Sequence, residues 1–445
     1  MTTKQVCILI YIVVCVVWVI WKWREPRGET KPEVAKTRER QKLRPRTPKS
    51  CAECQSESGL AIEPLREVRP WSEVKSPRGR KKQIDTEGRA CWNAICDYYG
   101  ITDSRVHALV GYGHHGKADR IQDLVCQACR TKVSERRGTA LYQLKTPAER
   151  VSEVLAILAE GLDVSAAERV TRHTEATIQR WLTRVGMHAE RLHRHFFQGL
   201  DLKHIQLDEI KTRLREKAQE LWVWVAIDVT SKVVPVLEVG PRTQALANRV
   251  IHRLKDTLAV GCLPVFSSDG LRHYFYALTA HWGAWVEQEG KRKPQWQVSP
   301  DLQYGQVIKR CRRRRVVRVK YVMQWGVLAD LKARLKALGL SGRLNTAFVE
   351  RVNLTIRQCV SLLTRRTWRT AQTAGGLRLH LAWWQGYYHF VRPHLSLRTE
   401  YEQPIPRKGG QLARRYRSRT PAMAAGLTRH RWTVRELLSF PLPAA

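Results

Sequence analysis

The spacing of apolar residues divides the chain into segments of different character. An uninterrupted apolar run covers residues 6–21, whereas residues 25–88 are polar and rich in proline, lysine and arginine. Helical spacing then dominates residues 140–198, strand-length apolar runs begin near residue 203, and helical spacing returns after residue 327. This order predicts several folded domains that come after a basic linker over 25–88, which we expect to be disordered.

The apolar run at residues 6–21 is close to the length of a membrane-spanning helix. At about 1.5 Å per residue it would cover roughly 24 Å, compared with ~30 Å for a hydrocarbon core. Trp18 and Trp21 suit a membrane interface, and basic residues after the run favour a cytoplasmic location for the rest of the chain. Residues 1–24 are therefore a candidate membrane anchor. A non-native upstream start codon and a buried hydrophobic helix are the alternatives.

Residues 140–198 show the pattern of three short helices. Thr146-Pro147 is typical of a helix start, Ser165 is a candidate cap for a second helix, and Thr174 begins a third that includes residues 174–185. This arrangement predicts an all-α helix-turn-helix domain.

In the third predicted helix, Ile178, Trp181, Leu182 and Val185 face the core. The outward side chains suited to base edges and phosphates are Thr177, Gln179, Arg180 and Arg184. A plain helical bundle would show the same periodicity, so the pattern alone leaves both interpretations open.

From about residue 203 the pattern becomes that of an α/β domain. Three strand-length runs are followed by a helix and a fourth strand, over 205–208, 221–228, 233–239, 243–258 and 263–267. This succession predicts a mixed sheet covered by helices. We expect the domain to span residues 203–395 and to be followed by a basic, irregular tail over 396–445.

The charge of the chain indicates a polyanionic partner. The sequence has 78 lysine and arginine residues against 40 aspartate and glutamate residues, a formal net charge of +38. Because such an excess repels itself unless an anionic partner offsets it, the composition favours binding to double-stranded DNA or another nucleic acid.

The cysteines are spaced like metal ligands. Of the 11 cysteines, Cys91 and Cys96 form one close pair, and Cys126 and Cys129 form another. Four thiolates in two short turns provide the ligands of a structural Zn²⁺ ion, which predicts a zinc ribbon over residues 89–138. Because the gap between Cys91 and Cys96 is wide, a ligand from His107, His114 or His115 is an alternative. The pair Cys51 and Cys54 is either half of a metal site or two ordinary thiols, and we favour the latter interpretation.

Three carboxylates are candidates for a catalytic metal site. Asp208 lies on the first predicted strand, Asp269 comes directly after the fourth strand, and Glu350 lies on a helix predicted over 346–363. Phosphodiester cleavage uses two divalent cations roughly 4 Å apart, and Mg²⁺ prefers carboxylate oxygens. Asp228 at the end of the second strand is a rival for Asp208, and we expect Glu209 to point to the opposite strand face.

Three motifs around these carboxylates resemble a known family. Leu207-Asp-Glu-Ile210, Ser268-Asp-Gly270 and the helix segment Asn345-Thr-Ala-Phe-Val-Glu-Arg-Val-Asn-Leu-Thr-Ile-Arg357 are similar to the catalytic signatures of bacterial insertion-sequence DDE transposases. The resemblance is greatest to the type with a zinc ribbon and a helix-turn-helix. Leu363-Thr-Arg-Arg-Thr367 and the segment 388–397 resemble the sequence after the catalytic helix in that family, so the likeness covers roughly residues 89–398.

The resemblance implies a fold and an activity. It implies a ribonuclease-H-like catalytic domain, Asp208, Asp269 and Glu350 as catalytic ligands of Mg²⁺ or Mn²⁺, and recognition of terminal inverted repeats. Asn353 and Arg357 share the helix face of Glu350 and are candidate DNA contacts. The chain departs from compact family members by a long gap between Asp269 and Glu350. This gap predicts an insertion near 285–320, whose basic segment 309–315 is a candidate phosphate-contacting strand or loop.

The sequence therefore predicts a multidomain DNA transposase that cleaves and transfers DNA strands. We expect a homo-oligomer on DNA, located in the cytoplasm with the nucleoid or anchored at the inner face of the membrane. One alternative is a catalytically inactive DNA-binding regulator derived from a transposase. Another is a membrane-anchored DNA tether, which would depend on residues 6–21 alone.

Overall fold

The computed structural model describes residues 68–75, 84–215, 220–313, 315–365, 370–407 and 412–442. The candidate anchor at 1–24, the pair Cys51 and Cys54, and most of the predicted linker at 25–88 lie outside these residues. The prediction of a transmembrane helix is corrected, because no helix within the described ranges has the length and apolar character needed to cross a membrane.

A small sheet forms the first module. It consists of β1 (Leu109–His115), β2 (Ile121–Cys126) and β3 (Lys132–Ser134), which are antiparallel in the order β1-β2-β3. Gly116 comes directly after β1, at the start of the turn, and its φ is +95°. A Cβ at this position would lie 2.3 Å from the Asp119 carbonyl oxygen. The turn therefore requires glycine. The short helix α2 (Trp71–Val74) docks on this module through Trp71, whose indole donates to Gln127 over 2.7 Å.

Three helices come next, and the third is longer than predicted. They are α3 (Ala148–Ala159), α4 (Val164–Thr171) and α5 (Glu175–Phe196), with Asp163 rather than Ser165 as the cap of α4. The helix α5 continues through Gly186 because it packs closely on a later helix, α10 (Ala374–Phe390). A Cβ on Gly186 would lie 2.5 Å from the Leu379 carbonyl oxygen.

A six-stranded mixed sheet forms the centre of the next domain. Its order is β11-β10-β7-β4-β5-β6, with parallel pairing of β4 to β7 and of β7 to β10, and antiparallel pairing elsewhere. The strands are β4 (His204–Arg213), β5 (Glu220–Asp228), β6 (Val236–Gly240), β7 (Val265–Ser268), β10 (Tyr304–Arg312) and β11 (Arg315–Trp325). The third strand begins later than predicted, at Val236.

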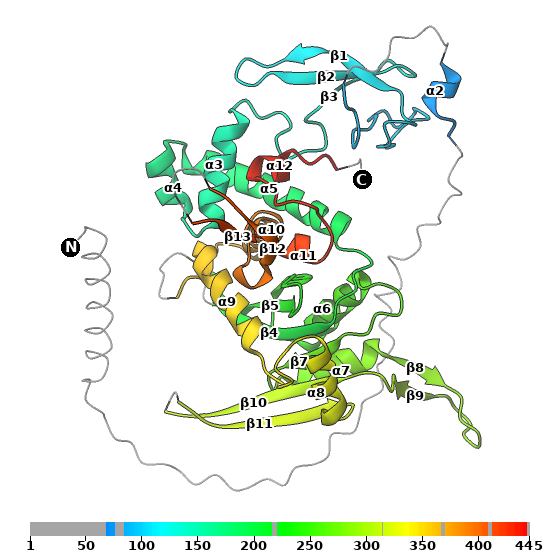
Figure 1. Cartoon of the computed structure of the whole chain (residues 1–445), viewed down its shortest axis with the longest axis vertical. Coiled ribbons are helices and arrows are strands. Elements are labelled where there is room, and N and C mark those ends of the chain that lie inside the picture. Colours follow the sequence, from blue (N-terminus) through cyan, green and yellow to red (C-terminus); the bar gives the residue numbers. More distant parts are fainter. Residues whose placement is uncertain are drawn as a thin grey trace, which may run out of the picture. The chain divides into compact units, whose positions relative to one another are not determined.

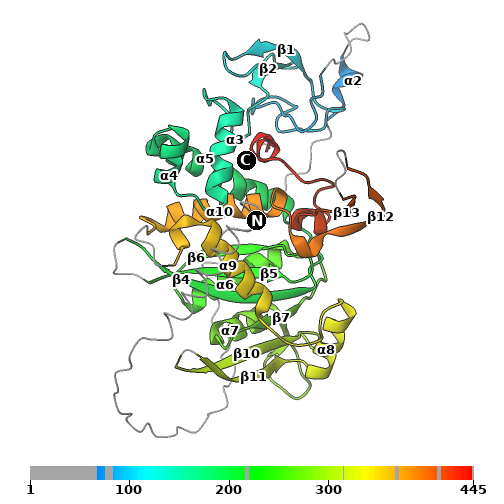
Figure 2. The same ribbon diagram turned by 60° about the vertical axis from the view of Figure 1, so that its left-hand side comes forward.

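Helices cover both faces of this sheet (Figures 1 and 2). On one face, α6 (Gln244–Thr257) and α7 (Arg272–His281) pack against Leu207, Trp224 and Phe266. On the other face lie α9 (Ala347–Cys359) and α10, which pack against Ile210, Val223 and Val225. The helix α8 (Leu328–Ala337) covers Val307 of β10. The first core also includes residues of α3 and α5, so the three-helix segment and the sheet domain share one core.

Two predicted boundaries differ from the structure. The helix predicted over 346–363 ends at Cys359, and a 3-10 turn over Ser361–Leu363 comes after an extended Val360. The insertion predicted near 285–320 is divided, because only β8 (Gly283–Val286) and β9 (Gln295–Val298) form a separate hairpin. The strand β10 belongs to the central sheet. The apolar residues of β10 end at Ile308 and basic residues follow, so the apolar pattern of the sequence did not reveal this strand.

The prediction of an irregular C-terminal tail over 396–445 is wrong. The segment contains β12 (Thr399–Ile405), β13 (Arg414–Arg417), α11 (Pro421–Ala424) and α12 (Val434–Ser439). Trp432 stacks on Phe390 with ring centroids 4.6 Å apart, and Leu437 and Leu438 are buried in the main core. A capping box between Thr433 and Glu436 begins α12, and this pattern was a sequence signal for a helix.

Backbone hydrogen bonds fix this segment to the N-terminal half of the chain. The Ala140 amide donates to the Leu438 carbonyl over 3.0 Å, and the Leu442 amide donates to the Gly138 carbonyl over 3.1 Å. The C-terminal segment is therefore joined by backbone hydrogen bonds to the chain around residues 138–140.

The buried histidines predict a loss of stability in acid. Burial lowers the pKa of His193 to about 4, compared with ~6.5 in an unfolded chain. Between these values the unfolded chain binds a proton that the folded chain does not, so the free energy of unfolding decreases as the pH falls from 6.5 towards 4. His193 contributes a slope of up to about 1.4 kcal/mol per pH unit.

The variant His193→Gln tests this expectation, because glutamine does not titrate and still offers a donor to the Pro235 carbonyl, which His193 contacts at 2.8 Å. Urea unfolding at several pH values should give a flatter profile for the variant. Identical slopes for the two proteins would contradict the assignment.

Candidate functional site

Four cysteines converge in the small N-terminal sheet module. The sulfur atoms of Cys91, Cys96, Cys126 and Cys129 all lie within 4.8 Å of one another. The Cys91–Cys129 and Cys96–Cys126 sulfur distances are 3.6 Å and 3.8 Å. Sulfurs of a tetrahedral Zn²⁺ site with Zn–S bonds of about 2.3 Å are separated by about 3.8 Å. The four thiols therefore fit a tetrahedral zinc ion.

The candidate histidine ligands lie elsewhere. His107 is buried, and its two ring nitrogens contact the Thr86 carbonyl and the Leu109 amide. His114 faces Arg120 at 3.5 Å, and His115 pairs with Asp123 at 2.8 Å. The structure thus brings together the four predicted cysteines and leaves the three histidines outside the cluster.

The thiols differ in their electrostatic environment. Burial raises the pKa of Cys96 to about 11, and the neighbouring thiols add to this shift. At Cys129, burial has the same effect, but hydrogen bonds with Thr131 outweigh it and lower the pKa to about 6. Crowded, buried thiols of this kind are stabilised as thiolates by a bound metal ion.

Two neighbouring parallel strands position Asp208 and Asp269. Leu207 of β4 is paired with Ser268, the last residue of β7, so the next residue of each chain segment is an aspartate. The carboxylate oxygens of Asp208, Glu209 and Asp269 lie within 4.8 Å of one another. The sheet therefore places three carboxylates at the end of β7.

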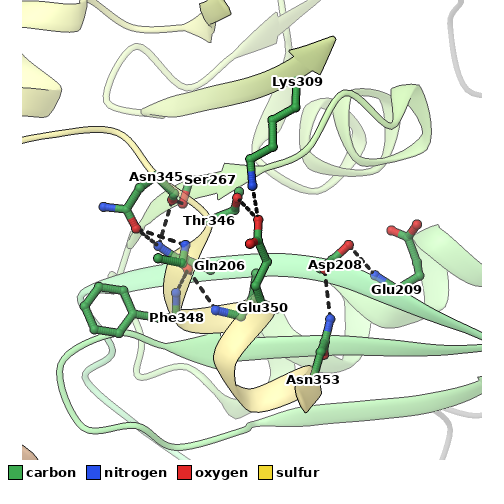
Figure 3. Close-up of polar contacts among 12 residues, drawn as sticks. Gln206, Asp208, Glu209, Ser267, Lys309, Asn345, Thr346, Phe348, Glu350 and Asn353 are labelled. Atoms are coloured by element: carbon green, nitrogen blue, oxygen red, sulfur yellow. Dashed lines mark hydrogen bonds and ion pairs between the residues drawn. The ribbon is translucent and has the colours of Figure 1, made fainter. Parts of the chain in front are cut away.

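The helix α9 places Glu350 on the wall of the same cleft, although its carboxylate is not part of the compact group of Asp208, Glu209 and Asp269 found among the described residues. Asp208, Asp269 and Glu350 all line one cleft of about 670 Å³. Glu350 accepts hydrogen bonds from Lys309 and from the Thr346 hydroxyl, the latter at 2.7 Å (Figure 3). Burial tends to raise the pKa of Glu350, but these contacts and the charge of Lys309 lower it below its usual value.

A buried glutamine fixes the helix to the strand. Gln206 of β4 is completely buried, and its side-chain oxygen accepts from the Phe348 and Val349 amides, each at 3.0 Å. Its side-chain nitrogen donates to the Asn345 carbonyl over 2.8 Å (Figure 3). Since the first amides of a helix have no partner within the helix, Gln206 supplies their acceptor and sets the position of Glu350 against Asp208.

Asn353 binds Asp208 directly. One turn after Glu350, the Asn353 side chain donates to an Asp208 carboxylate oxygen over 2.8 Å (Figure 3). The other Asp208 oxygen accepts from the Glu209 amide at 2.9 Å. The structure therefore makes Asn353 a positioning residue for Asp208, and its role as a DNA contact stays a prediction.

Burial raises the proton affinity of Asp208 and Glu209, and charge repulsion adds to the effect. Burial raises the pKa of Asp208 to about 6, with a further contribution from Asp269 and Glu350. Burial also raises the pKa of Glu209 to about 7, with repulsion from Asp269 and Asp208 acting against the attraction of Arg242. Crowded carboxylates with this balance fit hard divalent cations, which prefer oxygen ligands and offset negative charge.

Glu209 and Asp228 are both engaged by neighbouring groups, but of the two only Glu209 has its carboxylate close to those of Asp208 and Asp269. Glu209 lies on the α6 and α7 face of β4, as expected from strand alternation, and pairs with Arg242 at 2.9 Å. Asp228 is buried and accepts five hydrogen bonds, from Lys203, His204, Thr230 and Ser231. The bonds from Thr230 and Ser231 close the turn after β5, and Asp228 is not among the residues that line the cleft, which favours Asp208 over its rival.

The walls of the cleft carry positive charge. Arg242, Arg272 and Lys309 line it together with the carboxylates. Because the cations surround the acidic centre, a phosphate-bearing ligand would be attracted to the walls while divalent cations are held at the centre.

The predicted DNA-reading residues differ in exposure. On α5, Gln179 and Arg180 are exposed, and Thr177 is half-buried and accepts from Arg180 over 3.2 Å. Arg184 instead donates to the Tyr142 carbonyl. Arg357 of α9 donates to the Leu363 and Lys211 carbonyls, each at 3.3 Å. Arg184 and Arg357 thus contact carbonyl groups of the protein itself, and their role as DNA contacts stays a prediction.

The comparisons with known proteins give no family assignment. A scan against protein-family models finds no match for this chain, and a search of curated proteins finds no match either.

Sequence reasoning missed Gln206, Lys309 and Arg242. A polar residue between Ile205 and Leu207 in a buried strand was the available signal for Gln206. Lys309 was assigned only to a basic segment, and its contact with Glu350 depends on how β10 and α9 meet in space.

The cysteine geometry predicts one bound zinc ion. Metal analysis of the full-length protein, purified without chelator, should give about one equivalent of zinc, which Cys96→Ser should remove. Cys262→Ser is the matched control, because Cys262 lies outside the cluster. The zinc-free protein should lose the β1–β3 module, since few buried residues other than the cysteines hold it together. A folded, zinc-free wild-type protein would refute the site.

Proposed function

We propose that the protein is a metal-dependent DDE transposase that cleaves DNA strands and joins them to a target. The observation that carries this proposal is the convergence of Asp208, Asp269 and Glu350 in one cleft, from two neighbouring parallel strands and a helix. These residues are far apart in the sequence and belong to the three motifs that resemble the family signatures.

The arrangement of the sheet supports a ribonuclease-H-like catalytic domain. Three antiparallel strands, β4 to β6, are followed by two strands that are added in parallel on the other side of β4. The acidic residues lie near the middle of this sheet, on β4 and directly after β7. Helices on both faces bury the strands and keep these positions rigid.

The residues of the cleft have separate roles in the proposed reaction. Asp208, Asp269 and Glu350 would hold Mg²⁺ or Mn²⁺, which would activate the attacking oxygen and stabilise the leaving oxygen of a phosphodiester. Asn353 orients Asp208, and Gln206 fixes the beginning of α9. Arg242 and Arg272 line the cleft where they would bind phosphate groups.

Lys309 would have to move away from Glu350 before Glu350 could hold a metal ion. It forms an ion pair with Glu350 in this structure, so its positive charge neutralises the carboxylate that would otherwise bind a metal cation. This ion pair is the one observation that favours the alternative, a catalytically inactive DNA-binding regulator. Both candidates bind DNA, and only the transposase cleaves it.

The remaining modules support binding to double-stranded DNA. The cysteine cluster would hold a structural Zn²⁺ ion, and the exposed face of α5 would read the terminal repeats. Since zinc-binding thiols persist in a reducing compartment, we place the protein in the cytoplasm with the nucleoid. Strand transfer at two element ends would require at least two copies on DNA, so we expect a homo-oligomer there.

The carboxylates predict a separation of cleavage from binding. Asp208→Asn, Asp269→Asn and Glu350→Gln keep the side-chain volume but remove a charge, so each should lower strand cleavage by roughly 10³-fold or more. Duplex binding should remain close to that of the wild-type protein. The effects should not add, because the three residues act as one unit. Asp256→Asn is the control, because Asp256 is exposed on α6.

Cleavage is measured with Mg²⁺ on a duplex that carries the repeats flanking the coding sequence. Normal cleavage by Asp208→Asn would refute the site, and cleavage absent from the wild-type protein would favour the inactive regulator.

The helix α5 gives a second prediction. Arg180→Ala should weaken binding to duplexes enriched from a random-sequence library by roughly 1–3 kcal/mol, without loss of stability. Arg184→Ala should mainly lower the free energy of unfolding, since it removes the contact with the Tyr142 carbonyl. Anisotropy titration and thermal unfolding of both variants separate the two roles. An Arg180→Ala variant that binds normally would mean that another surface reads the DNA.

A further inference from the structure

A two-stranded ribbon extends the sheet domain beside the acidic cleft. The strand β10 pairs with β7 only from Tyr304 to Gln306, whereas its pairing with β11 continues to Arg312. We call residues 307–313 and 315–322 the ribbon (Figures 1 and 2). Residues 308–313 and 315–321 are exposed, so this part of the hairpin is not buried against the rest of the described chain.

The pairing register separates the side chains of the ribbon into two faces. Cross-strand partners share a face, and successive residues alternate between faces except at a bulge, where the register shifts between Arg310 and Cys311 and Val317 has no partner across the ribbon. Lys309 points towards α9, where it contacts Glu350, so Ile308 and Arg310 point the other way, towards the α7 side of the sheet. The basic face of the ribbon comprises Arg310, Arg312, Arg315, Arg318 and Lys320.

The like charges on this basic face destabilise the pairing of its two strands. Arg310 is directly opposite Arg318, and Arg312 is directly opposite Arg315. Like charges in directly opposed positions destabilise a strand pair. Within the described ranges, none of these arginines forms an ion pair with a carboxylate. An anionic ligand on this face would relieve the repulsion.

The ribbon begins at the wall of the cleft. Ile308 and Lys309, at its base, line the same cleft as Asp208, Asp269 and Glu350. A polyanion held along the basic face would therefore pass directly beside the acidic residues.

The chemistry of the face indicates duplex DNA bound without sequence preference. A two-stranded ribbon fits the major groove of a DNA duplex, which is about 12 Å wide. The face offers guanidinium and ammonium groups for phosphates but no asparagine, glutamine, serine or threonine at the paired positions 308–320, so it has little capacity for varied base contacts. Charge contacts of this kind are independent of sequence.

We infer that the basic face of the ribbon binds target DNA and holds it beside the cleft during strand transfer. Binding of duplex DNA follows from the ribbon itself, whereas the role in strand transfer rests on the proposed function. The ribbon adds to the proposed function a surface for target DNA. This surface binds DNA without sequence preference and is separate from α5.

The test compares two variants that each remove two positive charges. Arg310→Gln with Arg318→Gln alters one opposed pair of the ribbon, and Lys332→Gln with Lys336→Gln alters two exposed lysines of α8. Binding of the full-length proteins to a labelled 30-base-pair duplex of mixed sequence is measured by anisotropy, in EDTA and over a range of salt concentrations. EDTA prevents cleavage, so this experiment is independent of catalysis.

The ribbon variant should bind roughly 60-fold more weakly at 0.1 M salt, and its salt dependence should decrease by about 1.8 in slope, since two phosphate contacts are lost. The α8 variant should bind like the wild-type protein. The melting temperature of the ribbon variant should stay equal or rise, because repulsion is removed.

Three results would overturn the inference. The first is an unchanged affinity and salt slope for the ribbon variant, and the second is an equal loss for the α8 variant, which would indicate a general effect of net charge. The third is a loss confined to one duplex sequence, which would assign the ribbon to reading element ends. A wild-type protein that never cleaves DNA but shows the ribbon effect would refute the proposed catalysis and leave the DNA-binding surface in place.

Discussion

The acidic cleft depends on the buried side chain of Gln206. A glutamine in a strand has no intrinsic preference for a helix start, and its burial would be costly if its polar atoms were unpaired. Here its oxygen accepts from two amides of α9 and its nitrogen donates to the preceding loop. The same residue therefore satisfies the helix start and sets its distance from β4. Together with the apolar packing of α9 on β4 and β5, this placement brings Asn353 to Asp208.

The basic side chains around the cleft offset the negative charge of its carboxylates. Burial raises the pKa values of Asp208 and Glu209, and repulsion between the crowded carboxylates raises them further. Arg242 offsets Glu209 on one face of the strand, while Lys309 offsets Glu350 on the other. The carboxylates at the centre of the cleft therefore remain negatively charged overall, while basic side chains line its walls. Such an arrangement suits a ligand that carries phosphates and is accompanied by metal ions.

The sequence allowed a good part of this architecture to be predicted, for identifiable physical reasons. Runs such as 221–228 are apolar on both faces, and local spacing suffices to locate them. The convergence of Asp208, Asp269 and Glu350 in one cleft was expected from the motifs rather than from spacing. The strand β10 was hidden because its exposed end is basic, and the C-terminal segment was hidden because its few apolar residues pack on distant helices. The roles of Arg184, Asn353 and Arg357 depend on tertiary contacts that no local pattern records.

The docking of the C-terminal segment has a consequence for synthesis. The core around α3, α5 and α10 includes Leu437, Leu438 and Leu442, so it is incomplete until residue 442 has left the ribosome. At ~5–20 residues per second, the roughly 250 residues after α5 take about 12–50 s to translate. During that interval the apolar faces of the helical segment have no complete partner surface. A chain cut short before residue 420 would leave those faces uncovered, and quality-control proteases would find it far more readily than the full-length protein.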